Sequence, residues 1–225
     1  AFGTCDESCF RSSSISSRAL CISVLPFLLE YRPALVHFHY WGDCDFSWYD
    51  IFFRAVRTLG CRVVENVNTP VHPYEADFVD RYIYVSNYVR SSFGNDSGSR
   101  SLTIHPGSDF SLFSRRGNRQ LPSDCIGMVY RLENDKLNEQ SIDALVKVAQ
   151  RRPQTKVIIV GGGTFLELYR RAAKRAGVER NFVFTGYVDY SKLPELYEQM
   201  TIFVAPGWKE SFGQVSAFVA WPVLE

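Results

Sequence analysis

The chain has 225 residues, of which 46% are hydrophobic and 15% aromatic, and its formal net charge at neutral pH is +1. This length and composition suffice to bury one large core or two small ones. A charge so close to neutral provides no argument for nucleic acid or an anionic membrane as the main partner, and we expect no nucleic-acid partner.

The six cysteines form no C-x-x-C pair, and the C-x-x-x-C of Cys5 and Cys9 lacks the partners that a metal site needs. Free thiols in a reducing compartment are the better interpretation, so we expect a cytoplasmic protein. The apolar run at 19–31 is too short to span a bilayer, contains Pro26, and is not followed by a signal-peptide cleavage site. Residues 1–17 are expected to be irregular or to be the end of a truncated chain.

The first half of the chain shows apolar runs that alternate with a helix-like segment. Strands are expected at 34–41, 61–67, 80–86 and 101–107, with a helix-like segment at 46–60. A polar segment with glycine and proline, at 108–124, predicts a domain boundary near residues 112 to 123. We therefore place a first domain at 1–118 and a second at 119–225.

The second half is more regular. The expected order is strand 125–130, helix 138–152, strand 156–160, helix 164–177, strand 181–186, helix 191–200 and strand 201–206, then a helix that begins near Phe212 and Gly213. Strands that alternate with helices favour a parallel sheet covered on both faces. The fold class is therefore α/β.

Two cations follow the strand at 125–130. Arg131 lies at its end and Lys136 precedes the next helix. The carboxyl ends of parallel strands form the ligand crevice of an open sheet, and two cations beside a helix N-terminus suit a diphosphate. Solvated loop charges are the alternative interpretation.

Three glycines, Gly161 to Gly163, follow the strand at 156–160. They do not complete a dinucleotide-binding G-x-G-x-x-G pattern, because Leu166 stands where the last glycine is required. A tight turn that allows close backbone approach is the better interpretation.

Glu210 lies between the strand at 201–206 and the start of the next helix. The amides of Gly213 and Gln214 would form an anion site, and the Glu210 carboxylate could accept hydrogen bonds from sugar hydroxyls. Glu210 as a simple helix cap is the alternative.

Other candidates have weaker patterns. Asp43 and Asp45 form a D-x-D pair that could hold a divalent metal, but loop carboxylates are the favoured interpretation. His37 and His39 share one face of a strand without a third ligand at convincing spacing, and His72 could be a general base. We expect no metal site.

Several segments in order resemble the retaining nucleotide-sugar glycosyltransferases of family 4, which have the GT-B fold. The segments are "DRYIYVSNYVRSSF", "IHPGSDFSLF", "VYRLENDK", "VIIVGGGTFLELYRRAAKRAGV" and "FVFTGYVDYSKLPELYEQMTIFVAPGWKESFG". The resemblance covers about residues 33 to 220. It implies two Rossmann-like parallel-sheet domains, the first incomplete and the second without its last elements.

The resemblance also implies roles for single residues. Arg131 and Lys136 would hold the donor diphosphate and stabilise the leaving group, and Glu210 would contact the transferred sugar. The remaining donor-binding residues would be Gly163, Tyr187, Ser211, Phe212, Gly213 and Gln214. No cofactor and no metal would be required, because the cations and the helix N-terminus replace them.

The sequence departs from the family pattern at two positions. Phe218 occupies the place of the second glutamate, which usually binds ribose hydroxyls, so ribose recognition must differ or be weaker. Asn68 stands where many members carry an active-site histidine, and His72 is a candidate replacement on the acceptor side.

The leading hypothesis is a retaining, metal-independent glycosyltransferase that uses a nucleotide-diphosphate sugar. A truncated or degenerate protein that binds nucleotide sugar without turnover is the first alternative, and a sugar-nucleotide epimerase is the second. The acceptor, a saccharide, a lipid or a small molecule, is not defined by the sequence. No basic amphipathic helix supports association with a membrane.

Overall fold

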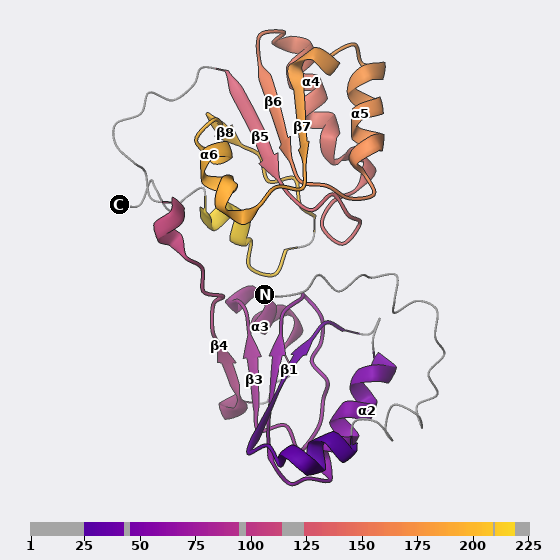
Figure 1. Ribbon diagram of the computed structural model, residues 1–225, viewed down its shortest axis with the longest axis vertical. Coiled ribbons are helices and arrows are strands. Elements are labelled where there is room, and N and C mark those ends of the chain that lie inside the picture. The colour runs from indigo at the N-terminus through magenta and orange to yellow at the C-terminus, as the bar shows by residue number, and fades with distance from the viewer. Residues whose placement is uncertain (1–24, 43–45, 95–97, 114–123, 209, 219–225) are drawn as a thin grey trace. The chain divides into compact units, whose positions relative to one another are not determined.

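The computed structural model describes residues 25–42, 46–94, 98–113, 124–208 and 210–218 (Figure 1). The chain divides into two compact units, Ala1–His105 and Pro106–Glu225. The boundary predicted at 118/119 falls within 114–123, outside the described residues, and stays a prediction. No helix among the described residues has the length and apolar character needed to cross a bilayer.

The first unit is built on a four-stranded parallel sheet with the strand order β1-β2-β3-β4. The strands are β1 (Leu35–Tyr40), β2 (Arg62–Val67), β3 (Arg81–Tyr84) and β4 (Ser101–Thr103). The helices are α2 (Phe46–Arg57) and α3 (Asn87–Phe93), with a 3-10 turn at Gly98–Arg100 and a further helical segment at 25–31.

One face of this sheet forms the core of the first unit. Phe38 of β1, Val63 of β2 and Tyr82 of β3 are buried with Phe53 and Val56 of α2. The Phe38 and Phe53 rings stack at 4.1 Å between centroids. Because side chains alternate along a strand, the opposite face carries the neighbouring residues of each strand.

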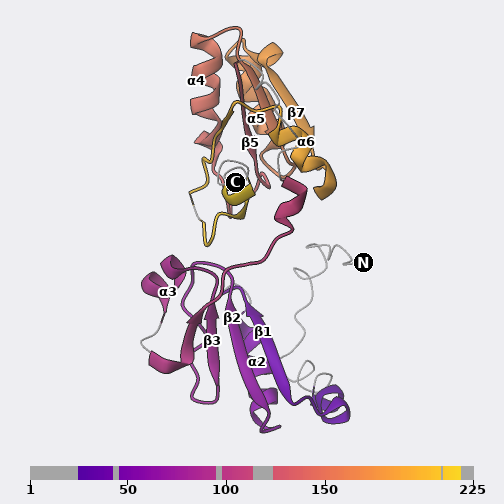
Figure 2. The ribbon, with the colours of Figure 1, turned by 90° about the vertical axis from the view of Figure 1, so that its left-hand side faces the viewer.

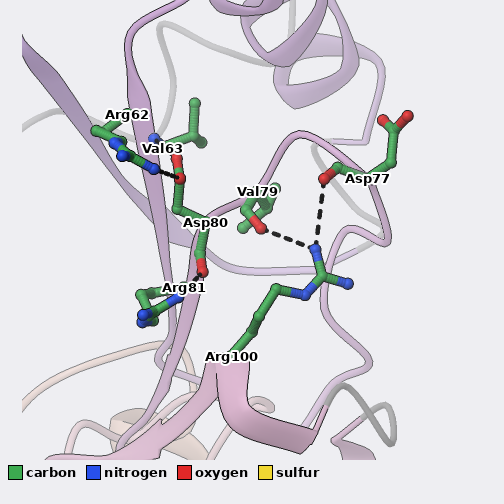
Figure 3. Close-up of polar contacts among 7 residues, drawn as sticks. All are labelled: Arg62, Val63, Asp77, Val79, Asp80, Arg81 and Arg100. Carbon is green, nitrogen blue, oxygen red and sulfur yellow. Dashed lines mark hydrogen bonds and ion pairs between the residues drawn. The ribbon is translucent and has the colours of Figure 1, made fainter.

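Polar contacts tie the beginnings of β2 and β3 together (Figure 3). The Asp80 carboxylate accepts from the Val63 amide at 2.8 Å and pairs with the Arg62 guanidinium. The amide hydrogen bond, followed by the one from Arg62, lowers the Asp80 pKa. Arg100 donates to the Val79 carbonyl at 3.0 Å, which attaches the turn before β4 to the same edge.

The second unit contains a second four-stranded parallel sheet, with the strand order β7-β6-β5-β8. Its strands are β5 (Cys125–Val129), β6 (Lys156–Val160), β7 (Phe182–Gly186) and β8 (Ile202–Phe203). The helices are α4 (Asp143–Arg151), α5 (Leu166–Arg175) and α6 (Leu193–Tyr197), with 3-10 turns at Phe110–Phe113, Glu139–Ile142, Glu179–Asn181 and Tyr190–Lys192. Residues 214–218 are also helical.

Helices cover both faces of this second sheet (Figures 1 and 2). On one face, Leu145 of α4 and Tyr169 of α5 pack with Met128 and Ile159. On the other face, residues of α6 such as Leu196 pack against the cluster around Val129, Ile158 and Val160. The near-continuous apolar sequences of β5 and β6 follow from this burial on both sides.

The predicted α/β class is confirmed, and each predicted strand and helix has a counterpart. One difference that bears on the site is at 201–206, where only Ile202–Phe203 belong to the sheet. Within the part of the chain that the structure describes, β8 pairs only with β5, through Ile202 and Phe203, and the chain then leaves the sheet toward the loop around Trp208.

Candidate functional site

Three loops meet at the carboxyl ends of β5, β6 and β8 in the second unit. The loop after β5 bonds to the loop after β6, because the Leu132 amide donates to the Gly162 carbonyl at 2.9 Å. The loop after β8 bonds to the first one, because the Trp208 amide donates to the Lys136 carbonyl at 3.2 Å. These bonds place the predicted cations, the glycine turn and Glu210 at one edge of the sheet, where ligands of open α/β sheets bind.

The glycine turn is required by close approach of backbones. A Cβ at Gly161 would lie 1.9 Å from the Tyr130 carbonyl oxygen, and one at Gly163 would lie 2.5 Å from the Leu132 carbonyl oxygen. Both residues also have positive φ, 124° and 142°. The interpretation of these glycines as a tight turn is therefore confirmed, and the turn fixes the loop that carries Arg131.

Glu133 holds the two loops together from the side, a role that the sequence did not reveal. Its carboxylate accepts from the Thr164 amide at 3.0 Å and from the Thr164 hydroxyl at 2.7 Å. The two residues are separated by 31 positions along the chain, so their spacing carried no signal.

Lys136 and Glu210 come together although 74 positions separate them. The Lys136 Nζ lies 3.3 Å from the Glu210 Oε2, and the two side chains are 30% and 31% exposed. Arg131, on the same loop, forms an ion pair with Asp135, also through partly exposed side chains. These two ion pairs thus comprise two cations and two anions, all partly exposed and accessible to a polar ligand.

Tyr130 lies beside Glu210 of this ion pair. The sequence analysis did not identify it as a site residue. Its side chain is 5% exposed. Burial, then the negative charge of Glu210 and a hydrogen bond to that carboxylate, raise the pKa of Tyr130 to about 12, against a smaller opposing contribution from Ser216. The phenol therefore stays protonated at neutral pH and donates to Glu210.

Trp208 anchors the loop that precedes Glu210. Its indole Nε1 donates to the Leu137 carbonyl at 3.2 Å, while its side chain remains largely exposed. Together with the bond from its amide, this contact fixes the loop at both the backbone and the side chain. The position of Glu210 therefore depends on the segment that carries Lys136.

Gly213 precedes the helical segment 214–218, as predicted. Its φ is 77°, and its carbonyl accepts from the amides of Ser216 and Ala217 at 2.9 and 3.1 Å. Ser211 and Phe212 are half-buried beside it, and the Gln214 side chain donates to the Ser108 hydroxyl. The amides at the start of this segment lie on the same loop as Glu210.

Tyr187 projects from the end of β7 beside the glycine turn. Its side chain is 71% exposed, and a Cβ at Gly162 would lie 2.7 Å from its ring. The Tyr187 ring thus lies against the bare backbone of Gly162. An exposed aromatic face at a sheet edge can stack on a planar ligand.

Phe218 faces the interior of the second unit. It is 5% exposed and stacks on Phe113 with ring centroids 4.3 Å apart and planes 4° apart. Tyr190 contacts both rings edge-on. The position where the family pattern has a second glutamate is therefore occupied by an aromatic core residue.

The acceptor-side candidates lie in the first unit and have different partners. The Asn68 amide nitrogen lies 3.3 Å from His39 Nδ1, and Asn68 Oδ1 accepts from Asn66 at 2.7 Å. His72 Nδ1 lies 3.0 Å from the Phe93 carbonyl and must donate to it, which leaves Nε2 as the acceptor of a neutral ring.

The metal candidates do not assemble within the part of the chain that the structure describes. No group of three or more His, Cys, Asp or Glu side chains there could hold a metal ion. The exposed His37 and His39 rings lie 4.6 Å apart, and burial followed by the charge of His39 lowers the His37 pKa. Asp43 and Asp45 lie outside the described residues.

Comparison with known proteins shows which family the second unit resembles. The profile of the family described as glycosyl transferases group 1 matches residues 111–216, which include all three loops of the site. Residues 111–216 are therefore similar to that family. The match ends before Phe218, so the aromatic substitution lies just beyond it.

Curated relatives carry related names. A GDP-mannose-dependent phosphatidylinositol monomannoside mannosyltransferase of Mycolicibacterium smegmatis is 31% identical over 140 residues, which are 56% of this chain and 36% of that protein. The D-inositol 3-phosphate glycosyltransferase 2 of Catenulispora acidiphila is 26% identical over 81% of this chain and 51% of its own length. The chain thus spans about half or less of these relatives.

Solved structures agree on the fold. The Anabaena protein HepE, solved in complex with UDP and glucose, is 18% identical and matches with a TM-score of 0.69. The match covers 93% of this chain and 62% of the HepE chain. The two parallel-sheet α/β units are therefore of the GT-B type, as predicted from the sequence.

Proposed function

We propose that the protein to which this chain belongs is a glycosyltransferase that uses a nucleotide-diphosphate sugar and retains the anomeric configuration. One observation carries the proposal. Lys136 and Glu210, a cation for the diphosphate and a carboxylate for the sugar, meet at the carboxyl edge of a parallel sheet within the family segment.

In the proposed reaction the bond between the anomeric carbon and the diphosphate oxygen breaks, and the acceptor hydroxyl oxygen bonds to that carbon on the same face. The acceptor hydroxyl loses its proton, and the diphosphate gains negative charge as it leaves. Arg131 and Lys136 stabilise this developing charge, because charge-assisted hydrogen bonds in a partly desolvated site are strong.

We propose further contacts of the donor with residues at this edge of the sheet. Glu210 accepts hydrogen bonds from hydroxyls of the transferred sugar, and the amides of Gly213 and Gln214 face the phosphate. Gly163 allows the backbone to approach the diphosphate, Ser211 and Phe212 flank it, and the exposed ring of Tyr187 lies beside the base.

We propose that no metal ion takes part, because two side-chain cations on one loop provide the charge that a metal would contribute. On the acceptor side we propose Asn68 and His72 of the first unit, with His72 Nε2 as the proton acceptor. The acceptor remains open among a saccharide, a lipid and a small molecule. The expected location is cytoplasmic.

A second candidate is a nucleotide-sugar-binding protein without turnover. The observation that favours it is Phe218, which is buried against Phe113 and presents no carboxylate. Incubation with a nucleotide sugar and candidate acceptors distinguishes the two proposals. Transfer releases nucleoside diphosphate and forms a glycoside of the acceptor, whereas the binding protein forms neither. An isomerised nucleotide sugar would instead indicate an epimerase.

Calorimetric titration with UDP, GDP and ADP tests the donor site. We expect one of them to bind, and we expect Arg131→Ala to weaken that binding at least tenfold, as loss of a charge-assisted contact would. Asp135→Asn is the matched control. It removes the anion that pairs with Arg131, so affinity should rise or stay constant.

No binding of any nucleotide to the wild-type chain would contradict the proposed donor site. An unchanged dissociation constant in Arg131→Ala would contradict the diphosphate assignment alone. Addition of EDTA tests the metal-independent reading, because it should leave both binding and turnover unaltered.

A further inference from the structure

The Glu210 carboxylate is held from two sides. Lys136 Nζ lies 3.3 Å from its Oε2. A Cβ placed on Gly207 would lie 3.3 Å from Glu210 Oε1 and also 3.3 Å from the Tyr130 hydroxyl oxygen. One carboxylate oxygen therefore faces Lys136, and the other shares the space above Gly207 with the Tyr130 phenol.

Tyr130 is a rigid support for this contact. Its backbone amide donates to the Val160 carbonyl at 3.0 Å, which extends the pairing of β5 with β6 by one residue. Its side chain is 5% exposed, so the ring has little freedom. A hydroxyl on a fixed ring selects one orientation of a carboxylate that is otherwise about one third exposed.

The direction of the hydrogen bonds follows from the chemistry of the groups. An ionised carboxylate only accepts, so the single phenol hydrogen of Tyr130 goes to Glu210, and the phenol oxygen accepts from Ser216. A carboxylate offers about four lone-pair sites, of which Tyr130 and Lys136 occupy two. The remaining sites are available to hydroxyls of a ligand.

We propose that Tyr130 is a positioning residue that orients Glu210 toward the hydroxyls of the donor sugar. This inference rests on the proposed function. Tyr130 itself does not touch the ligand. Its effect should therefore be confined to the sugar part of the donor, while the diphosphate contacts of Arg131 and Lys136 persist.

The test compares each nucleotide sugar with its own nucleoside diphosphate: UDP-glucose with UDP, GDP-mannose with GDP, and ADP-glucose with ADP. Calorimetry gives the ratio of the affinity for the nucleotide sugar to the affinity for the nucleoside diphosphate. Tyr130→Phe keeps the ring and removes only the hydroxyl. We expect this variant to lower the ratio about tenfold, the range for loss of a hydrogen bond to a charged group, with affinity for the diphosphate unchanged.

Two further variants separate positioning from general damage. Glu210→Gln should lower the same ratio, and the double variant should lower it no further than either single change, because both act through one carboxylate. Gly207→Ala should act in the same direction, since its Cβ would press on both Tyr130 and Glu210.

Tyr169→Phe is the matched control. Tyr169 is a fully buried tyrosine of the same unit whose hydroxyl donates to the Asn138 carbonyl at 2.6 Å. Its loss should leave the affinity ratio at the wild-type value, whatever it does to the melting temperature.

The outcomes are distinct. A normal ratio in Tyr130→Phe, or additive effects of Tyr130→Phe and Glu210→Gln, would overturn the positioning role while the donor site stands. A parallel loss of diphosphate affinity would also overturn it. If the wild-type chain binds no nucleotide, the proposed function and this inference both fail.

Discussion

At the scale of single residues, the protein places two glutamates in opposite surroundings. Glu210 is partly exposed beside Lys136, so its carboxylate is accessible to a ligand. Glu65 of β2 is fully buried, and only its Oε1 has a partner among the described residues, the Tyr74 amide at 2.8 Å. Burial raises the pKa of Glu65 to about 8, which the single amide bond only partly opposes.

Glu65 should make the stability of the first unit depend on pH. Between pH 4.5, its ordinary pKa, and pH 8, the unfolded chain is ionised at this position and the folded chain is protonated. The free energy of unfolding should therefore fall as pH rises, by about 5 kcal/mol in total across this interval. Urea unfolding at pH 5, 6.5 and 8 measures this slope.

Glu65→Gln mimics the protonated side chain and should abolish most of the slope, so that the variant exceeds the wild type in stability above pH 8. Glu75→Gln, at an exposed position of the same unit, is the control and should retain the wild-type slope. Equal slopes in the wild type and Glu65→Gln would show that Glu65 is ionised in the folded protein.

At the scale of elements, the segment 214–218 serves both the site and the core. Its first residues lie on the loop of Glu210, and its last described residue, Phe218, stacks on Phe113 of the turn Phe110–Phe113. Tyr197 of α6 donates to the Val215 carbonyl at 3.4 Å, and burial raises its pKa strongly. The aromatic contacts therefore fix the segment that follows the site.

Restoring a glutamate at position 218 should destabilise the second unit. Phe218→Glu would place a carboxylate beside Phe113 and Tyr190, at a cost of roughly 3–5 kcal/mol for an uncompensated buried charge. Thermal unfolding measures the loss, and nucleotide affinity should not improve. Phe218→Leu keeps position 218 apolar and should lose less thermal stability than Phe218→Glu. Tighter nucleotide binding by a stable Phe218→Glu variant would contradict the prediction that position 218 belongs to the core and does not bind nucleotide.

At the scale of the whole molecule, the two units have separate cores. The buried cluster of the first unit is formed by residues between Leu28 and Val89, and the two clusters of the second lie between Cys125 and Met200. Stability is therefore expected to be set within each unit.

Leu145→Ala should show this independence. Leu145 is 1% exposed between α4 and the sheet, and such a truncation costs about 2–5 kcal/mol. Hydrogen exchange should quicken in β5 and β6 and stay unchanged in β2 and β3. Equal acceleration in both sheets would mean that the units unfold together.

The spacing of apolar residues along the sequence predicted most of the fold. The apolar runs at β5 and β6 and the helical spacing of Ile142, Leu145 and Ala149 are local signals, because burial of one element imposes its own repeat on the sequence. The same reasoning placed Arg131, Lys136 and Glu210 at strand ends and helix starts. Their roles in binding stay predictions.

Contacts between distant residues were decided by the tertiary structure alone. Glu133 meets Thr164 and Tyr130 meets Glu210 because parallel strands bring their carboxyl ends to one edge. Phe113 meets Phe218 because the segment 214–218 packs on the turn Phe110–Phe113. The sequence around a carboxylate or phenol in a loop has no periodic pattern from which its partner could be predicted. The sequence by itself thus determined the helices and strands, the parallel arrangement of the strands, and the chemical groups at the edge of the sheet where the site lies. The packing of the chain decided which of those groups hold one another in place.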